Sequence, residues 1–290
     1  MSSLDTLRPS IAFSTLACPE WAPDEVVARA AAFGYDAIEW RGGPEGHVSP
    51  SWSARQRAEL RSRTAAAGVG ALAVTSYAAF VSPDAAVRAA NIADLVAHLE
   101  LAADLGAPFV RAFAGEREDD APSATLRGRA RDALLLAAET AATLGVDIVV
   151  EPHDDHVRAE LVAELLAAVD HPRVGCLWDP VNAWEAGEDP EVGAALLGPW
   201  IRYAQLKDAA GTGSTWRLTP IGEGEVPLLA GLRALSRRGP LPPLCVEWER
   251  AWHPELTPAA DALGPALIAV RALARAVASM KLDSDPEPAA

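Results

Sequence analysis

The feature that most constrains the fold is an alternation, repeated eight times, of a short apolar run and a longer helical segment. Consecutive runs begin between 26 residues (from 11 to 37) and 41 residues (from 203 to 244) apart, and a strand with its crossover helix needs about 30 residues. The runs are short and rich in apolar and β-branched residues, which is typical of buried strands. The eight runs are Ile11–Leu16, Ala37–Arg41, Ala71–Ser76, Phe109–Phe113, Asp147–Glu151, Arg173–Asp179, Tyr203–Lys207 and Leu244–Glu247.

Helix start and stop residues support this alternation. Residues 23–25, Pro-Asp-Glu, place a proline and two acids where a first helix would begin, and acids favour the positive end of a helix. Gly34, Gly68, Gly106 and Gly145 each stand between a helical segment and the next run. Glycine is the residue that most often ends a helix, so the segments are predicted to be separate helices.

Eight strand–helix units predict the α/β class and a (β/α)8 TIM barrel, for which about 250 residues is typical. The alternative is a doubly wound open sheet, which usually carries a glycine-rich turn after its first strand. Residues 15–19, Thr-Leu-Ala-Cys-Pro, contain no glycine. The barrel is therefore the preferred prediction.

The barrel is predicted to be a single domain over residues 1–280, followed by a disordered polar tail at 281–290. The segment 209–227 is expected to be a long loop rather than a linker. Within it, Gly222-x-Gly224 is interpreted as a turn and not as a phosphate-binding loop, because neither a lysine nor a strand-to-helix context follows it.

Composition excludes several functional classes. The chain has 25 Lys and Arg against 40 Asp and Glu, a net charge of −15, which disfavours nucleic acid and anionic membranes as partners. The three cysteines, Cys18, Cys176 and Cys245, are far apart, so no disulfide framework is expected. No uninterrupted apolar stretch of about 18 residues and no signal peptide are evident. A cytoplasmic protein is therefore expected.

Polar residues end four consecutive runs in the second half of the chain. In a parallel barrel the functional residues lie at the carboxyl ends of the strands, and alternate residues of a strand point to the same side. We therefore expect these residues to share one part of the barrel mouth: Glu151 and His153, Asp179, Gln205 and Lys207, and Glu247 and Glu249.

The strand-end oxygen atoms predict a site for one divalent metal ion. Oxygen ligands favour Mn²⁺ or Mg²⁺, and a mixed set also admits Co²⁺ or Zn²⁺. Three carboxylates and a dication leave a formal charge of −1, which Lys207, Arg111 and His153 are expected to balance while holding substrate oxygens. The predicted ligands are Glu151, Asp179, Gln205 and Glu247.

Four other residues near the strand ends are expected to contact either a protein side chain or the substrate. Arg111 lies within the fourth run, and a buried arginine needs a partner, either a neighbouring carboxylate or a substrate oxygen. Trp178 could line a polyol pocket or pack in the core. Glu249 is expected to lie behind the ligands, in reach of substrate. Glu39 is expected to pair with Arg111 or Arg41.

These motifs together resemble the xylose-isomerase-like TIM-barrel superfamily, the sugar phosphate isomerase/epimerase group. The resemblance covers almost the whole chain, from the first run to Glu247. It implies that the four strand-end residues bind one divalent ion, that Glu151 and Glu247 act as the acid/base pair, and that homo-oligomers are common. The motifs are Glu151-Pro-His, Trp178-Asp-Pro, Gln205-Leu-Lys-Asp, Pro220-Ile-Gly-Glu-Gly-Glu and Val246-Glu247.

Two positions depart from the family pattern. The usual histidine of the seventh strand is Gln205, and the histidine usually found three residues after the sixth-strand aspartate is Asn182. A glutamine carbonyl can still bind a metal, with less preference for zinc, and glutamine here is also similar to the 3-dehydroshikimate dehydratases. Asn182 is a candidate substrate contact in place of the family's histidine.

The resemblance implies an enzyme acting on a small polyhydroxy carbonyl compound. The preferred prediction is a metal-dependent isomerase or epimerase of a keto sugar or polyol, in which Glu151 removes the proton next to the carbonyl and Glu247 returns it to the enediolate. The first alternative is a dehydratase of the 3-dehydroshikimate or inosose type, with His153 and Lys207 as proton-transfer partners. The second alternative is a non-catalytic barrel that only binds a ligand. The preference rests on how common each activity is in the superfamily.

Overall fold

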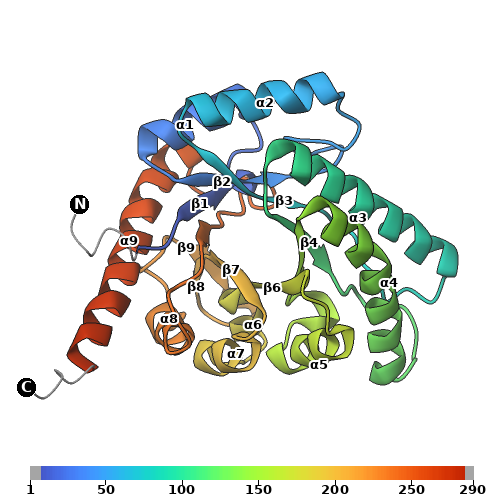
Figure 1. Ribbon diagram of the computed structural model, residues 1–290. Helices are drawn as coiled ribbons and strands as arrows, with labels where there is room; N and C mark the ends of the chain where they lie inside the picture. The colour runs from blue at the N-terminus through green and yellow to red at the C-terminus, as the bar shows by residue number, and fades with distance from the viewer. Residues whose placement is uncertain (1–7, 285–290) are drawn as a thin grey trace, which may run out of the picture.

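Eight parallel strands close into a barrel, and helices form a ring around it (Figure 1). The computed structural model describes residues 8–284. Around the barrel the strands follow the order β1-β10-β7-β6-β5-β4-β3-β2, and each predicted run overlaps one of them. Their bounds are β1 (Ile11–Ser14), β2 (Ala37–Arg41), β3 (Gly70–Thr75), β4 (Phe109–Phe113), β5 (Asp147–Glu151), β6 (Val174–Trp178), β7 (Ile201–Leu206) and β10 (Leu244–Val246). The predicted fold class is confirmed.

The helices occupy the segments between the strands. Gly34, Gly106 and Gly145 adopt positive φ angles of 88°, 78° and 72° at helix ends, a conformation that costs other residues energy because of their Cβ atom. The helices are α1 (Pro23–Phe33), α2 (Ala54–Ala66), α3 (Ala85–Leu105), α4 (Ser123–Leu144), α5 (Ala159–Val169), α6 (Pro180–Glu185), α7 (Pro190–Leu197), α8 (Leu228–Ser236) and α9 (Ala259–Ser284).

The predicted boundary of the tail is wrong by four residues. Helix α9 continues through Ser284, because neither proline nor glycine interrupts the sequence between Met280 and Pro286. The rest of the predicted tail, residues 285–290, lies outside the described residues.

Helix α9 also qualifies the expectation that the chain lacks a membrane-spanning segment. Within the described residues, Ala259–Met280 is the one helix long and apolar enough, by length and composition alone, to cross a membrane. The same helix contacts β1, β10, α1 and α8, and its buried residues recur every three or four positions, as on one face of a helix. These residues are Ala259, Leu263, Leu267, Val270, Ala274 and Val277.

The core has two parts, as the alternation of side chains along a strand requires. A small cluster fills the interior of the barrel, and a larger one lies between the strands and the helices. Because the interior is filled by side chains, open space remains at the carboxyl ends of the strands. The interior cluster consists of Ala12, Ala37, Leu72, Ala73, Val149, Leu177, Tyr203 and Cys245.

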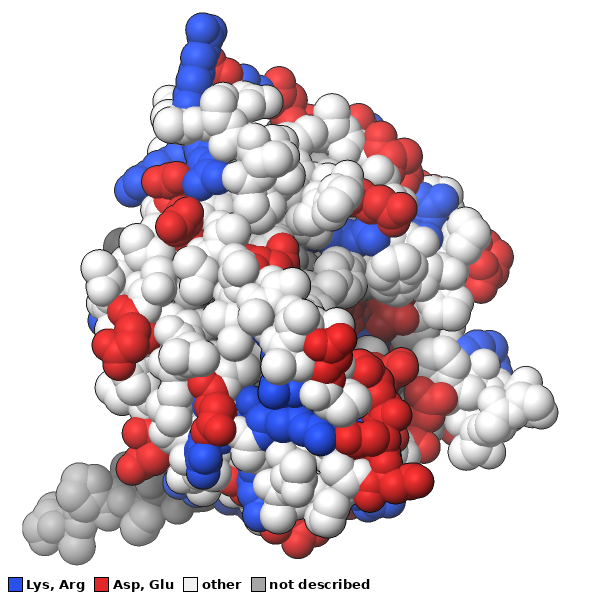
Figure 2. All heavy atoms as spheres, turned by 90° about the vertical axis from the view of Figure 1, so that its right-hand side faces the viewer, with Lys and Arg blue, Asp and Glu red and all other residues white. Residues whose placement is uncertain are grey.

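The surface carries the excess of acidic residues. Figure 2 shows one face, on which Asp and Glu side chains form several groups and Lys and Arg side chains lie between them. Many of the basic residues are paired with acids there or elsewhere, for example Arg127 with Glu164 and Arg129 with Asp119. Pairs of this kind on the surface contribute little to stability.

An antiparallel hairpin, β8 (Asp208–Ala210) and β9 (Arg217–Thr219), follows β7 and begins the long loop. The buried Asp208 carboxylate accepts hydrogen bonds from the backbone N–H groups of Gly222 at 2.9 Å, Gly224 at 3.1 Å and Val226 at 3.3 Å. The Gly222-x-Gly224 element is therefore a turn fastened to a carboxylate. A Cβ atom at position 224 would lie 2.1 Å from Asp208 Oδ1.

Gly224→Ala is expected to lower the free energy of unfolding by about 1 to 3 kcal/mol, because the added methyl group displaces the Asp208 carboxylate from its donors. Gly128→Ala is the matched control, since nothing lies within 4 Å of a Cβ added there on α4 and alanine favours a helix over glycine by up to about 1 kcal/mol. Urea unfolding of both variants measures the difference. An unchanged stability of Gly224→Ala would contradict the role given to Asp208.

Candidate active site

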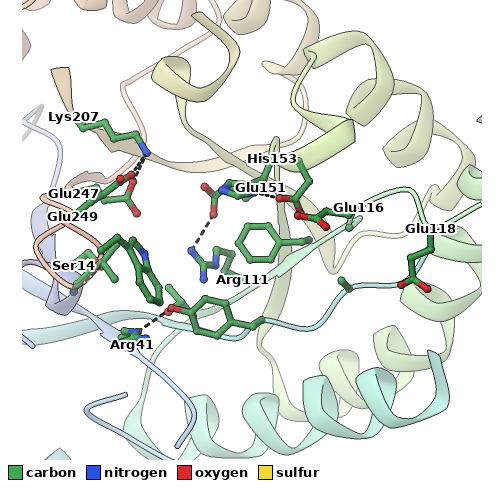
Figure 3. A pocket seen from close by; sticks show the side chains of 18 residues that line it. Ser14, Arg41, Arg111, Glu116, Glu118, Glu151, His153, Lys207, Glu247 and Glu249 are labelled. Atoms are coloured by element: carbon green, nitrogen blue, oxygen red, sulfur yellow. Dashed lines mark hydrogen bonds and ion pairs between the residues drawn. The ribbon is translucent and has the colours of Figure 1, made fainter. Parts of the chain in front are cut away.

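A cavity of about 470 Å³ opens at the carboxyl ends of the strands (Figure 3). One side of it carries residues that end or follow β5, β7 and β10, and the other side carries residues from β2, β4 and two loops. The first group consists of Glu151, His153, Lys207, Glu247 and Glu249. The second includes Arg41, Tyr77, Arg111, Phe113 and Trp252.

Lys207 is the buried cation around which the first group is arranged. Its Nζ atom lies 2.8 Å from Asp179 Oδ2. It also lies 2.8 Å from Glu247 Oε2 and binds Glu249 (Figure 3). Burial by itself lowers the pKa of a lysine, but the surrounding carboxylates outweigh it and raise the pKa of Lys207 well above its usual value. Lys207 therefore remains charged.

One ammonium group cannot neutralise three carboxylates. Burial accordingly raises the pKa of Glu247 well above its usual value, although Lys207 opposes the shift. For Glu249, which is less enclosed, the pKa is lowered, because Lys207 outweighs the effect of burial. Two carboxyl groups on one strand end thus have pKa values shifted in opposite directions, the pattern of a proton donor beside a charged group.

Arg111 gives Glu151 the partner that a buried carboxylate needs. Arg111 Nη1 donates to Glu151 Oε2 at 3.1 Å, and Asn182 Nδ2 donates to Glu151 Oε1 at 3.1 Å. Burial raises the pKa of Glu151, and the positive charge of Arg111 partly offsets that rise. Of the two partners considered for Arg111, a neighbouring carboxylate or a substrate oxygen, the structure shows the carboxylate of Glu151. Asn182 contacts Glu151 and lies behind the residues that line the cavity.

Gln205 is oriented by a carboxylate inside the barrel. Gln205 Nε2 donates to Glu39 Oε1 at 2.8 Å, and the Tyr203 hydroxyl donates to Glu39 Oε2 at 2.6 Å. The expectation that Glu39 pairs with Arg111 or Arg41 is wrong. Tyr203 and Gln205 alternate on β7 and point inward, so their donors reach Glu39 directly.

The predicted metal ligands have the donor atoms that a hard divalent ion prefers. Gln205 Oε1 is buried and has no hydrogen-bond donor, and a buried acceptor without a donor costs about 1–3 kcal/mol. Asp179 Oδ2 is also buried, and its partner is the Lys207 ammonium group at 2.8 Å. Over residues 8–280, no three His, Cys, Asp or Glu side chains are grouped so that they could hold an ion. Lys207 lies beside Asp179 and Glu247, and Arg111 lies beside Glu151. The donor chemistry fits an ion that competes with Lys207.

Trp178 does not reach the cavity, so its prediction as a substrate contact is wrong. The side chain is 1% exposed and lies close to Gly193 and Gly231, which leave room for the indole ring. Leu177 faces the barrel interior, and Trp178, as the next residue of β6, points outward toward the helices.

Sequence reasoning missed Arg41, Tyr77 and Trp252 as lining residues. Arg41 could have been found, because it follows the inward-facing Glu39 by two residues on β2 and must share its side. Tyr77 and Trp252 lie in loops after β3 and β10, where no periodicity gives the direction of a side chain.

His153 stands at the edge of the cavity beside an acid. Its Nδ1 atom lies 2.5 Å from Asp154 Oδ1, and 44% of its side chain is exposed. Burial lowers the pKa of His153, but the hydrogen bond to Asp154 and the charge of Glu151 outweigh burial and raise it. Asp154 has a positive φ of 52°, which asparagine tolerates as well as aspartate.

Sequence comparison identifies a family and one curated relative. The family model described as xylose isomerase-like TIM barrel matches residues 27–269. A 3-dehydroshikimate dehydratase of Bacillus anthracis is 29% identical over 101 residues, which are 34% of this chain and 36% of that protein. The matched part is thus about a third of the relative's length.

Solved structures with the same fold are more extensive matches. A structure described as IOLI protein with a bound zinc atom is 21% identical and has a TM-score of 0.77, covering 92% of this chain and 99% of that one. An L-ribulose 3-epimerase is 18% identical and has a TM-score of 0.78, covering 96% and 99%. At these identities the likeness concerns the fold.

Asp154→Asn is expected to lower the pKa of His153, because it removes the negative charge that stabilises the imidazolium. Because the pKa of His153 is raised in the folded protein, protonation of its ring stabilises the fold. This stabilisation is complete below the pKa of the unfolded state, about 6.5, and is lost as the pH rises through the pKa of the folded state. The variant is therefore also expected to be less stable than the wild type at low pH. NMR titration of the His153 ring measures the pKa. Asp155→Asn is the control, since Asp155 instead accepts from the Arg117 backbone. A pKa of His153 equal in the two variants would contradict the assignment.

Proposed function

The chain belongs to the xylose isomerase-like TIM-barrel family, and from that premise we propose that it is a divalent-metal-dependent isomerase or epimerase of a small polyhydroxy carbonyl compound. The observation that carries the proposal is the pair of buried carboxyl groups, Glu151 and Glu247, which line one cavity and each contact a cation. Such a pair can remove and return a proton next to a carbonyl group.

Glu151 is proposed as the base. Arg111 and Asn182 hold both of its oxygen atoms, which fixes the carboxylate at the end of β5. Its raised pKa brings the carboxylate closer to the proton affinity that general-base catalysis needs near neutral pH.

Glu247 is proposed as the acid that returns the proton. It follows β10, and β6 and β7 lie between β5 and β10 around the barrel, so the two carboxyl groups approach a substrate from different directions. The strongly raised pKa of Glu247 favours its protonated form, as an acid requires. Lys207, which also binds Glu249, holds it in place.

Four residues are proposed to hold the metal ion: Glu151, Asp179, Gln205 and Glu247. The buried oxygen atom of Gln205, which has no hydrogen-bond donor, supports this set. A bound divalent ion would supply Lewis-acid stabilisation of the negative charge that develops on the substrate oxygen. Lys207, relieved of part of its carboxylate contacts, would then be free to bind a substrate oxygen at the same end of the cavity.

A second candidate is a metal-dependent dehydratase. The match to a 3-dehydroshikimate dehydratase over 101 residues favours it, as does the position of His153, whose raised pKa suits a proton donor to a departing hydroxyl group. Both candidates begin with removal of the same α-proton by a base, and they differ in whether a proton returns to carbon or a hydroxyl group leaves.

Proton exchange in D₂O distinguishes these functions. With Mn²⁺ or Mg²⁺ added, and ketoses, inososes and 3-dehydroshikimate as substrates, NMR is expected to detect deuterium at the carbon next to the carbonyl. Glu151→Gln and Glu247→Gln are each expected to slow exchange by at least roughly 100-fold. Glu185→Gln, on α6, is a control for the same change of charge.

An epimeric or isomeric product supports the first candidate, and a new alkene or aromatic signal supports the dehydratase. Metal-loaded protein that exchanges no proton with any substrate of the panel would contradict both, and would favour a barrel that only binds ligand.

Gln205→His is expected to increase the affinity for Zn²⁺ relative to Mn²⁺, because an imidazole nitrogen is a softer donor than an amide oxygen. Gln205→Leu is the comparison, since it removes the donor and is expected to weaken both metals. Equilibrium dialysis with metal analysis measures the two affinities. Wild-type affinities in Gln205→Leu would contradict the assignment of Gln205 as a ligand.

A further inference from the structure

The cavity has two chemically different sides, and only one of them has been given a role. The proposed acid/base and metal residues belong to β5, β6, β7 and β10, which are neighbours around the barrel. Arg41 ends β2, which lies opposite β6 in the ring of eight strands. In Figure 3, Lys207 lies at the top and Arg41 at the bottom of the labelled side chains on the left, with Glu247, Glu249 and Ser14 between them in the view.

Arg41 is a buried cation with an incomplete set of partners. Its side chain is 8% exposed. Nε donates to the Tyr77 hydroxyl at 2.9 Å, and Nη1 donates to the Glu45 backbone carbonyl at 3.2 Å. Between residues 8 and 280, the one carboxylate within 4.0 Å belongs to Glu45, at 3.8 Å from Nη2, and the Glu45 side chain is 86% exposed. An ion pair of that length with so exposed a partner is strongly screened by water.

The other two cations of the cavity are paired differently. Arg111 lies 3.1 Å from the buried Glu151 carboxylate, and Lys207 lies 2.8 Å from both Asp179 and Glu247. Buried charges are normally paired, and Arg41 is the exception among the three. Arg41 lines the cavity, where its remaining guanidinium N–H groups can donate to a ligand.

Aromatic rings fix the Arg41 guanidinium without neutralising it. The guanidinium carbon lies 4.6 Å from the Trp252 ring centre and 5.8 Å from that of Tyr77. Tyr77 and Trp252 also pack edge to face, with their centres 6.4 Å apart. A planar guanidinium held in this way is preorganised to form two parallel hydrogen bonds to a planar anion.

We propose that Arg41, with Tyr77 and Trp252, forms a carboxylate-binding subsite, and that the substrate is a polyhydroxy carbonyl compound carrying a carboxylate at the end remote from the reacting carbon. This rests on the proposed function for the position of the reacting carbon. A carboxylate is preferred to a phosphate because one guanidinium matches a single negative charge.

Binding of three matched ligands tests the subsite without requiring turnover. Benzoate, its neutral analogue benzamide and phenyl phosphate are titrated by calorimetry into the full chain with EDTA present. Benzoate is expected to bind wild-type protein at least roughly ten-fold more tightly than benzamide does, as for a charge-assisted hydrogen bond. Arg41→Met is expected to remove that difference by weakening benzoate alone.

Two further variants keep the result interpretable. Arg41→Lys retains the charge without the planar fork, and it is expected to weaken benzoate less than Arg41→Met does. Arg55→Met, on the exposed face of α2 where the side chain is 87% exposed, makes the same change of charge and is expected to bind benzoate as the wild type does. Thermal melts monitored by circular dichroism establish that each variant is folded.

Several results overturn the proposal. The first is benzoate affinity unchanged in folded Arg41→Met or Arg41→Lys protein, and the second is equal binding of benzoate and benzamide. The third is no binding of benzoate to the wild type up to about 50 mM, a concentration at which even a Kd of about 10 mM gives roughly 80% occupancy. The fourth is tighter Arg41-dependent binding of phenyl phosphate. The proposed function is tested separately by proton exchange. Exchange without benzoate binding removes only the subsite, and benzoate binding without exchange removes only the enzymatic proposal.

Discussion

Closure of the parallel barrel is the constraint on which the rest of the molecule depends. Once eight strands are hydrogen-bonded in a ring, their carboxyl ends meet at one mouth, and the side chains there share a small volume in which many of them are buried. Charges that are far apart in the sequence, such as Arg111 and Glu151, or Lys207 and Glu247, then become each other's partners. The strong attraction of such pairs roughly offsets the loss of their hydration, so the cluster serves chemistry more than stability.

The mouth of the barrel is organised in layers. Glu39, Tyr203 and Gln205 form a buried hydrogen-bonded group at the lower level, and Arg41, two residues beyond Glu39, reaches the cavity above it. The lower group orients the amide of Gln205, so that its oxygen is left without a donor. Residues that only position others are thus as important to the site as those that line it.

The loop after β7 is held by the residue that follows Lys207. Asp208 accepts hydrogen bonds from three backbone N–H groups of the segment around Gly224, which ties a loop of low regularity to the end of a barrel strand. Lys207 and Asp208, which are adjacent in the sequence, therefore have different roles. Lys207 faces the carboxylates of the site, and Asp208 fixes the loop beside it.

The sequence by itself determined the barrel, because strand and helix periodicities and the glycines between them depend on local structure. It also brought Glu151, His153, Lys207, Glu247 and Glu249 to one mouth, because alternation along a strand and the ring of strand ends are general rules. Only the tertiary structure decided which charges pair, since Glu39 binds Tyr203 and Gln205 instead of an arginine. It also turned Trp178 outward and brought Tyr77 and Trp252 from loops to Arg41. Such contacts depend on side-chain direction in loops and on competition among many buried partners, which no local pattern encodes.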